Sequence, residues 1–281
     1  MRPPFFFVLL YNVLIFLVNS MMDFLLYLAL GACSGLLAGL FGIGGGLIIV
    51  PVLIFSFTLQ GFSGEVLTHL AVGTSLSAIF FTSINSVLAH HKKGAVEWRM
   101  VIWLGAGILF GSSLGGVTAS YIPGANLQQI IGVFSLLMSL QMALNWRPKG
   151  QGQGLTKPVM SVAGVVIGWV SAIFGIGGGS LMVPFLSWKG VDIKKAVATS
   201  AACGLPIALS GTLSFIVIGW NHTLLPSKSL GFVYLPALAG IALMSMFSAR
   251  FGALLAHKLN PLMLRRLFAL LLFVVGVNFL V

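Results

Sequence analysis

The sequence FGIGGGLIIVPVL at residues 41–53 returns as FGIGGGSLMVPFL at residues 174–186. Ten of the nineteen positions from Gly35 to Leu53 are identical in Gly168 to Leu186, so the chain contains an internal repeat. In each copy the glycines interrupt an apolar run, and glycine permits a sharp bend with exposed backbone amides. Two such interruptions, in corresponding places of two halves, are typical of a transporter site in the middle of a membrane.

The composition indicates an all-α polytopic membrane protein. Of the 281 residues, 58% are hydrophobic and only 7% are charged, whereas a soluble domain carries about 25% charged residues. The net charge of +11 would suggest nucleic acid in a soluble chain. Here the basic residues lie in short loops between apolar runs, so we expect a lipid bilayer and no nucleic-acid partner. Cys33 and Cys203 lie inside apolar runs without metal-ligand spacing, and no metal or cofactor is expected.

Apolar segments divide the chain into two halves around a polar linker. The first repeat covers residues 23–144, the linker residues 145–157, and the second repeat residues 158–281. Residues 1–22 form an apolar extension that is a signal peptide, an extra helix, or a stretch upstream of a true start at Met21 or Met22. The predicted segments are 24–41, 47–59, 66–89, 100–120 and 127–144, then 158–174, 180–188, 196–219, 231–256 and 262–281.

The second segment of each half is too short to cross a bilayer comfortably. Crossing takes about 20 helical residues, and segments 47–59 and 180–188 have thirteen and nine. Either the first two segments form a re-entrant hairpin, or both cross as short, broken helices. In both cases the chain returns to the side where it started and three crossings remain, so the halves have opposite orientations.

This topology predicts two inverted repeats, each made of a glycine-broken pair of short helices and three transmembrane helices. With a cytoplasmic linker, fourteen of the fifteen basic residues lie inside, and only Lys228 lies outside. Such a bias is what the positive-inside rule describes.

The glycine motifs provide the first candidate binding groups. Backbone amides at the start of a helix bind anions, because the helix dipole is positive there. The predicted substrate-binding amides belong to Gly44, Gly45, Gly46, Gly177, Gly178 and Gly179. The alternative is that these glycines only allow close helix packing. Their duplication, each time before a short helix with a Val-Pro pair, favours binding.

Hydroxyl pairs provide the second candidate groups. Thr74-Ser75 and Thr199-Ser200 occupy corresponding places in AVGTS and AVATS. We expect their hydroxyls to donate hydrogen bonds to an oxyanion, with Asn85 extending the polar face. Alternatively, such hydroxyls bond their own backbone or a neighbouring helix, and Asn85 only joins helices.

One pair of ionisable residues is a candidate for proton coupling. His69 lies one helical turn after Glu65, at the outer end of segment 66–89, near its first residue. Ionisable residues inside a membrane often relay protons. The alternative places both residues at the membrane interface, where their charges cost little.

Motifs of enzyme chemistry are missing from the sequence. It contains neither HExxH nor CxxC, so no catalytic residue is predicted and the protein is not expected to be an enzyme. The four acidic residues, Asp23, Glu65, Glu97 and Asp192, lie outside the segment cores. A cation transporter usually needs a buried carboxylate, so the predicted partner is a small anion.

The duplicated FGIGGG…VP motif, the AVGTS and AVATS counterparts, the length and the basic linker make residues 22–281 similar to the TauE/SafE family. This family comprises sulfite exporters and toluene sulfonate uptake permeases. The resemblance implies proton-coupled secondary transport of small sulfur-containing anions, such as sulfite or organosulfonates, across the bacterial inner membrane. Its glycine motif falls on Gly42 to Gly46 and Gly175 to Gly179, and its Thr-Ser positions on Thr74, Ser75, Thr199 and Ser200.

The resulting hypothesis is a multi-pass transporter that alternates access around two glycine breaks. Two other classes remain as alternatives: a passive anion channel built on the same site, and a membrane scaffold without transport. No oligomeric state is predicted.

Overall fold

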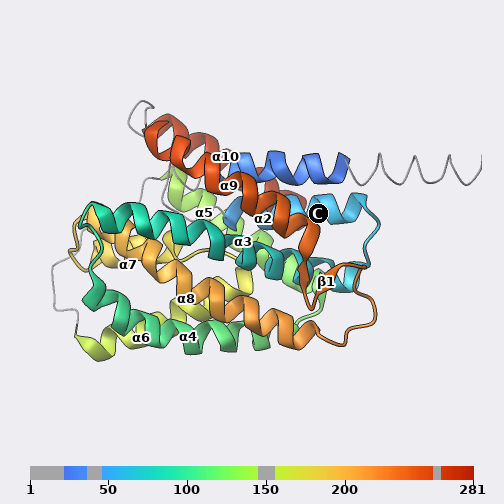
Figure 1. Cartoon of the computed structure of the whole chain (residues 1–281), viewed down its shortest axis with the longest axis horizontal. Coiled ribbons are helices and arrows are strands. Elements are labelled where there is room, and N and C mark those ends of the chain that lie inside the picture. The colour runs from blue at the N-terminus through green and yellow to red at the C-terminus, as the bar shows by residue number, and fades with distance from the viewer. Residues whose placement is uncertain (1–21, 37–45, 145–155, 256–260) are drawn as a thin grey trace, which may run out of the picture.

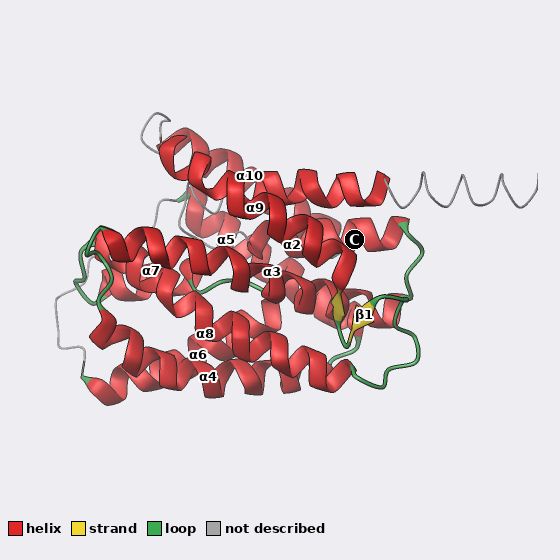
Figure 2. Cartoon of the chain, viewed as in Figure 1, coloured by secondary structure: helices red, strands yellow, loops and turns green. Residues whose placement is uncertain are grey.

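The computed structural model describes residues 22–36, 46–144, 156–255 and 261–281. Helices dominate this part of the chain, and they lie roughly parallel to the long axis of the molecule (Figures 1 and 2). Residues 1–21, the linker residues 145–155, and Gly44 and Gly45 of the first glycine motif fall outside the described residues.

Each of the ten predicted segments overlaps a helix. The elements in chain order are the helix Met22–Leu36, α2 (Gly46–Leu59), α3 (Gly64–Lys92), α4 (Trp98–Ser120), α5 (Gly124–Ala143), α6 (Lys157–Phe174), α7 (Gly179–Trp188), α8 (Ile193–Gly219), β1 (Ser229–Leu230), β2 (Val233–Tyr234), α9 (Leu235–Leu255) and α10 (Pro261–Asn278). Four of them, α3, α4, α6 and α8, are long and apolar enough to cross a membrane. By contrast, α2 and α7 have 14 and 10 residues, fewer than the roughly 20 that a crossing takes.

A β-hairpin precedes α9, where the sequence predicted an apolar helix from residue 231. Strands β1 and β2 pair antiparallel, with Leu230 opposite Val233. Gly231, at φ +55°, provides the positive φ that a two-residue hairpin turn needs. The N–H of Phe232 donates to the carbonyl of Phe215 in α8 over 3.1 Å, which holds the hairpin against that helix.

Closely packed parallel helix pairs join each half to the other. In one pair, α4 runs beside α6, and a Cβ on Gly111 or Gly115 would overlap the backbone at Val165 or Trp169. In the other, the helix Met22–Leu36 runs beside α9, and a Cβ on Gly31 would stand 2.7 Å from the carbonyl oxygen of Ile241. Small residues four positions apart let two helix backbones approach closely. Such packing matters in a membrane, because the hydrophobic effect does not drive helices together in lipid.

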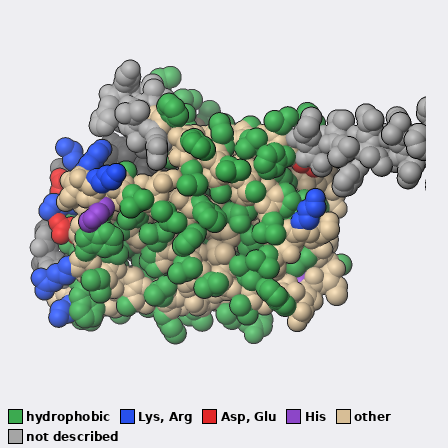
Figure 3. Space-filling model, in the orientation of Figure 1, with side chains coloured by type: hydrophobic (Ala, Val, Ile, Leu, Met, Phe, Trp, Pro, Cys, Tyr) green, Lys and Arg blue, Asp and Glu red, His purple; other side chains and the backbone are tan. Residues whose placement is uncertain are grey.

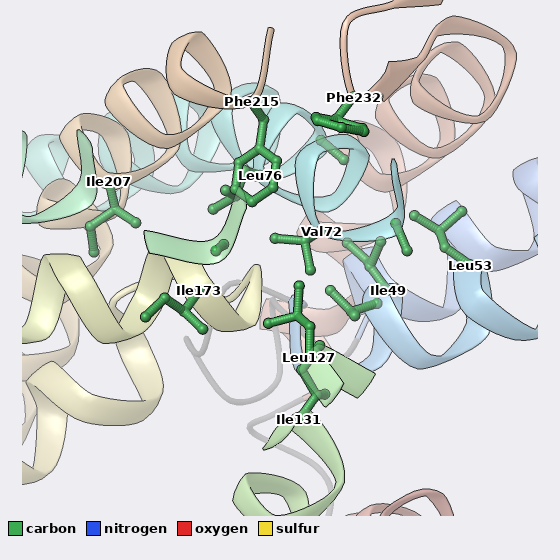
Figure 4. Packing of buried hydrophobic residues seen from close by; sticks show 14 of the residues in the cluster. Ile49, Leu53, Val72, Leu76, Leu127, Ile131, Ile173, Ile207, Phe215 and Phe232 are labelled. Carbon is green, nitrogen blue, oxygen red and sulfur yellow. The ribbon is translucent and has the colours of Figure 1, made fainter. Parts of the chain in front are cut away.

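Helices α3 and α8 form the centre of the molecule. They run antiparallel, because the end of α3 leads into the loop at Glu97 that pairs with Lys195 at the start of α8. In the most apolar window of α3, 83% of the residues are buried, against 39–50% in α4, α6 and α8. Figure 4 shows side chains of α2, α5, α6 and α8 converging on Val72 and Leu76 of α3.

Candidate functional site

The second glycine break joins α6 to α7 through residues 175–178. Gly175 ends α6 at φ +64°, a left-handed conformation that glycine adopts without strain. The N–H of Ile176 donates to the carbonyl of Ser171 over 3.0 Å, which folds the break back onto the last turn of α6. Every residue from Gly175 to Ser180 is buried. Irregular backbone at membrane depth is stable when protein surrounds it in this way.

The start of α2 lies directly against the second break. A Cβ on Gly46 would stand 2.7 Å from the carbonyl oxygen of Gly175 and 2.8 Å from Cα of Ile176. These distances are shorter than Cβ contacts in real structures, so the close approach requires glycine. Gly46 is the described member of the first predicted glycine set, since Gly44 and Gly45 lie outside the described residues. The fold thus brings the two motifs, far apart in the chain, into contact.

Both central helices support the second break. Ser75 of α3 donates from Oγ to the carbonyl oxygen of Gly175 over 2.8 Å. On the other side, a Cβ on Gly178 would stand 3.6 Å from the carbonyl oxygen of Ser200 and 3.9 Å from the nitrogen of Gly204, both in α8. The break is therefore held between the two helices that carry the AVGTS and AVATS sequences.

Helix α7 begins with backbone amides that have no acceptor. Within the described part of the chain, the N–H groups of Gly177, Gly178 and Gly179 donate no hydrogen bond. Gly178 is the N-cap residue and makes no side-chain cap. The first amides of a helix have no intrahelical partner, and the helix dipole gives them about half a positive charge. A buried, uncapped helix start of this kind is suited to an anion.

Two serines that flank the second break were missed by sequence reasoning. Ser171 precedes the break and Ser180 follows it; both are buried, and neither Oγ has a hydrogen-bond partner among the described residues. The predicted Ser200 is in the same condition. A comparison of the two copies of the motif could have pointed to these serines, because the first copy has Ala38 and Leu47 in the places of Ser171 and Ser180.

The two predicted threonines bond to loops of the opposite half. The Oγ1 of Thr74 accepts a hydrogen bond from the N–H of Tyr234 over 2.9 Å, just before α9. The Oγ1 of Thr199 accepts one from the N–H of Glu97 over 3.1 Å, just before α4. Both threonines are fully buried. In this structure they hold the ends of the molecule together, while Ser75, beside Thr74, bonds to the glycine break.

Asn85 does not join the glycine break. It is half-buried on α3, and no hydrogen bond described for this part of the chain involves its side chain. Ser83, two residues earlier, faces α8: its Oγ lies 3.0 Å from where a Cβ on Gly204 would stand. Residues two apart on a helix point in different directions, so Ser83 and Asn85 do not share a face.

His69 and Glu65 are not joined by an ion pair. His69 is 6% exposed, and its Nε2 lies 3.0 Å from the carbonyl oxygen of Ala119 at the end of α4. Its Nδ1 has no partner among the described residues, and its ring packs 5.3 Å from that of Phe232. Glu65 is exposed on the first turn of α3. The histidine is thus buried at one end of the helix bundle, with the carboxylate outside it.

Comparisons with known proteins identify the family of the chain. The family described as sulfite exporter TauE/SafE matches residues 27–279. A "Probable membrane transporter protein" of Haemophilus influenzae is 39% identical over 255 residues, covering 90% of this chain and 97% of the relative. One from Methanocaldococcus jannaschii is 30% identical over 90% of this chain and 96% of its own length. The Bacillus subtilis protein YunE, with the same description, is 31% identical over 72% and 83%.

No solved structure matches the chain. The family match spans both glycine motifs and all the labelled helices, and the apolar helices identify an integral membrane protein. The chain therefore belongs to the TauE/SafE family of membrane proteins.

Proposed function

We propose that the protein is a secondary transporter of small sulfur-containing anions, such as sulfite or organosulfonates. One observation carries the proposal: the uncapped amides of Gly177, Gly178 and Gly179 are buried at the start of α7, where the start of α2 also lies. Helix dipoles act more strongly at a buried site, because little water screens them there. The description of the matching family, sulfite exporter, supports sulfur oxyanions as the class of substrate.

The charges of the protein support an anion rather than a cation. All four acidic residues are described, and none of them is buried. Figure 3 shows Lys and Arg side chains gathered at the end of the molecule where α3 leads into α4, with hydrophobic side chains over the middle. We place this lysine-rich end at the cytoplasmic face of a bacterial inner membrane, in accordance with the positive-inside rule.

We further propose that residues 23–144 and 158–281 form inverted repeats joined by a cytoplasmic linker at residues 145–157. Reciprocal contacts support this. The first helix of each half pairs in parallel with the fourth helix of the other, as α6 with α4 and Met22–Leu36 with α9. The threonine of each central helix accepts a hydrogen bond from the loop before that same fourth helix. Inverted repeats of transporters commonly surround a midplane site.

Alternating access would then proceed by opening one end at a time. We name the two closed ends by their contacts. The charged latch consists of Thr199, Glu97 and Lys195, and the aromatic latch consists of Thr74 and Tyr234 with the rings around Tyr234. Opening the charged latch exposes the glycine breaks to the lysine-rich side, and opening the aromatic latch exposes them to the other side.

His69 is the residue that we propose for proton coupling. It is buried at the aromatic end of α3, beside the hairpin residue Phe232, so opening this end would change its access to water. Glu65 lies four residues earlier at the surface, where it would exchange protons with solvent. His69→Gln is expected to abolish the dependence of uptake on a proton gradient while anion exchange persists.

Uptake of radiolabelled sulfite into proteoliposomes under an imposed proton gradient tests the proposal, with thiosulfate and an alkyl sulfonate as competitors. Gly178→Leu should abolish uptake, because its Cβ would stand 2.9 Å from Cδ1 of Ile207 and the larger side chain would crowd the start of α7. Gly64→Leu is the matched control, since a Cβ at Gly64 meets nothing within 4 Å. Wild-type uptake by Gly178→Leu would contradict the site.

Counterflow separates a transporter from a passive anion channel on the same site. Unlabelled anion on the far side should accelerate uptake of the labelled anion in a transporter, whereas a channel cannot show this. A well-folded protein without any anion flux would point instead to a membrane scaffold.

A further inference from the structure

Among the described residues, three of the five buried serine hydroxyls without a partner belong to Ser171, Ser180 and Ser200, near the second glycine break. Ser171 and Ser200 are fully buried and Ser180 is 8% exposed, yet no Oγ of the three has a hydrogen-bond partner in the described chain. Several buried serines elsewhere in the described chain are paired, although the Oγ atoms of Ser187 and Ser229 also lack a partner. Ser112, Ser135 and Ser139 donate to carbonyl oxygens over 2.7–2.9 Å. A buried hydroxyl without a partner is destabilising, and each such group in a folded protein calls for an explanation.

The backbones of these three serines lie close to the free amides at the start of α7. Ser171 accepts from Ile176 at its backbone, so the break curls back against it. Ser180 is the second residue of α7, directly after the three amides without acceptors. The carbonyl of Ser200 is the group 3.6 Å from where a Cβ on Gly178 would stand. The three serines thus come from three helices, α6, α7 and α8, whose backbones meet at one uncapped helix start.

The sequence around the first glycine motif has no serines at the equivalent positions. It has Ala38 and Leu47 in the places of Ser171 and Ser180. Leu47 and Ile48 are buried in an apolar cluster with Ile176 and Leu272. Ser75, the counterpart of Ser200, already donates its hydrogen bond to the carbonyl of Gly175. The two copies of the motif therefore differ in side-chain chemistry at aligned positions of the sequence.

We infer that the second break coordinates the oxygen atoms of the anion, through the hydroxyls of Ser171, Ser180 and Ser200 and the amides at the start of α7. Leu47 and Ile48, at the start of α2, form an apolar wall of the site. This inference rests on the proposed anion transport and assigns its specificity to one half of the protein. Ser171 and Ser180 are specificity-determining residues, and they bind the oxyanion in the direction set by the α7 dipole.

Two readouts of Ser180→Ala and Ser171→Ala test the inference on the full-length protein in nanodiscs, with sulfite as the probe. Without anion, their melting temperatures should equal or exceed that of the wild type, because each change removes an unpaired buried hydroxyl. Sulfite affinity, measured by calorimetry, should fall at least about tenfold for each, as expected for losing a hydrogen bond to a charged group. Ser180→Thr keeps the hydroxyl and should retain more affinity than Ser180→Ala.

Ser135→Ala is the matched control. Ser135 is 1% exposed, but its Oγ donates to the carbonyl of Ile131 over 2.8 Å. Its replacement should leave sulfite affinity unchanged.

If the wild type binds sulfite and the Ser171 and Ser180 variants bind it equally well, the inference is wrong while the proposed transport stands. If the variants melt at lower temperature with unchanged affinity, the hydroxyls are structural and the inference is again wrong. A wild type that binds neither sulfite nor an alkyl sulfonate overturns both.

Discussion

The two latches close opposite ends of the molecule with the same backbone contact and different side chains. In each, a threonine of a central helix accepts a hydrogen bond from a loop N–H, over 2.9 Å at Tyr234 and 3.1 Å at Glu97. Around Tyr234 the rings of Tyr27, Phe57 and Phe62 lie 5.3–6.3 Å away. At the other end, Lys195 reaches Glu97 over 2.6 Å.

These surroundings predict unequal strengths. Each aromatic pair contributes about 0.5–1.5 kcal/mol, whereas an exposed ion pair contributes about 0–1 kcal/mol. The side chains of Lys195 and Glu97 are 52% and 37% exposed, so solvent weakens their attraction. We therefore expect the resting protein to open more readily at its lysine-rich end.

The largest expected effect comes from exchanging small residues between the two ends. A Cβ on Gly73 would overlap the carbonyl oxygen of Phe232, whereas the corresponding residue of the second repeat is the buried Ala198. Gly73→Ala should force the hairpin away from α3, at a cost of about 3 kcal/mol, and reduce anion flux more than tenfold. Ala198→Gly should cost about 1 kcal/mol. Denaturation in mixed micelles measures both, and equal costs would mean that the two ends are packed alike.

Removing the central ring of the aromatic latch should have the next largest effect. Tyr234→Ala eliminates three ring contacts and should weaken this end by about 2 kcal/mol. Tyr234→Phe should behave as wild type, because the backbone N–H is the donor to Thr74. Opening is measured by impermeant maleimide labelling of a cysteine at Thr68, which is 1% exposed, in a protein without Cys33 and Cys203. Equal labelling of the two variants would exclude the rings from closure.

The hairpin that carries Tyr234 was not predicted from the sequence, whereas the short helices were. Glycine breaks and segment lengths predicted α2 and α7 within a residue or two of their observed starts. The hairpin at residues 229–234 escaped, since its residues are apolar and its stability comes from Phe215 and Thr74, which are distant in the chain. Likewise, the motif Thr-Ser revealed two candidate hydroxyls in each copy, but it could not show that each threonine accepts from a distant backbone N–H and that Ser75 bonds to the break.

Breaking the shared backbone contact should affect the two ends equally. Thr74→Val and Thr199→Val each leave one loop N–H without an acceptor, at an expected cost of about 1 kcal/mol. Thr74→Val should raise labelling from the aromatic side, and Thr199→Val from the lysine-rich side. A cost at one end only would show that the hydrogen bonds, though alike in length, do not close the two ends in the same way.

The smallest effect, and the sharpest contrast between the ends, concerns salt. Lys195→Gln or Glu97→Gln should weaken the charged latch by less than about 1 kcal/mol. High ionic strength should do the same in the wild type, because the screening length falls from about 10 Å at 0.1 M to about 3 Å at 1 M salt. A cysteine at Ala202, which is 2% exposed in a cluster with Val87 and Val96, reports opening at this end.

Exchanging the two charges isolates the ion pair from its neighbours. Glu97→Lys or Lys195→Glu alone places like charges together and should raise labelling at Ala202, whereas the double variant recreates the pair and should restore protection. The hydrogen bond from the N–H of residue 97 to Thr199 survives in all three, since it involves the backbone. Labelling at Thr68 should not respond to salt or to any of these changes. If it does, the two ends are coupled, and the charged latch acts on the whole bundle rather than on its own end.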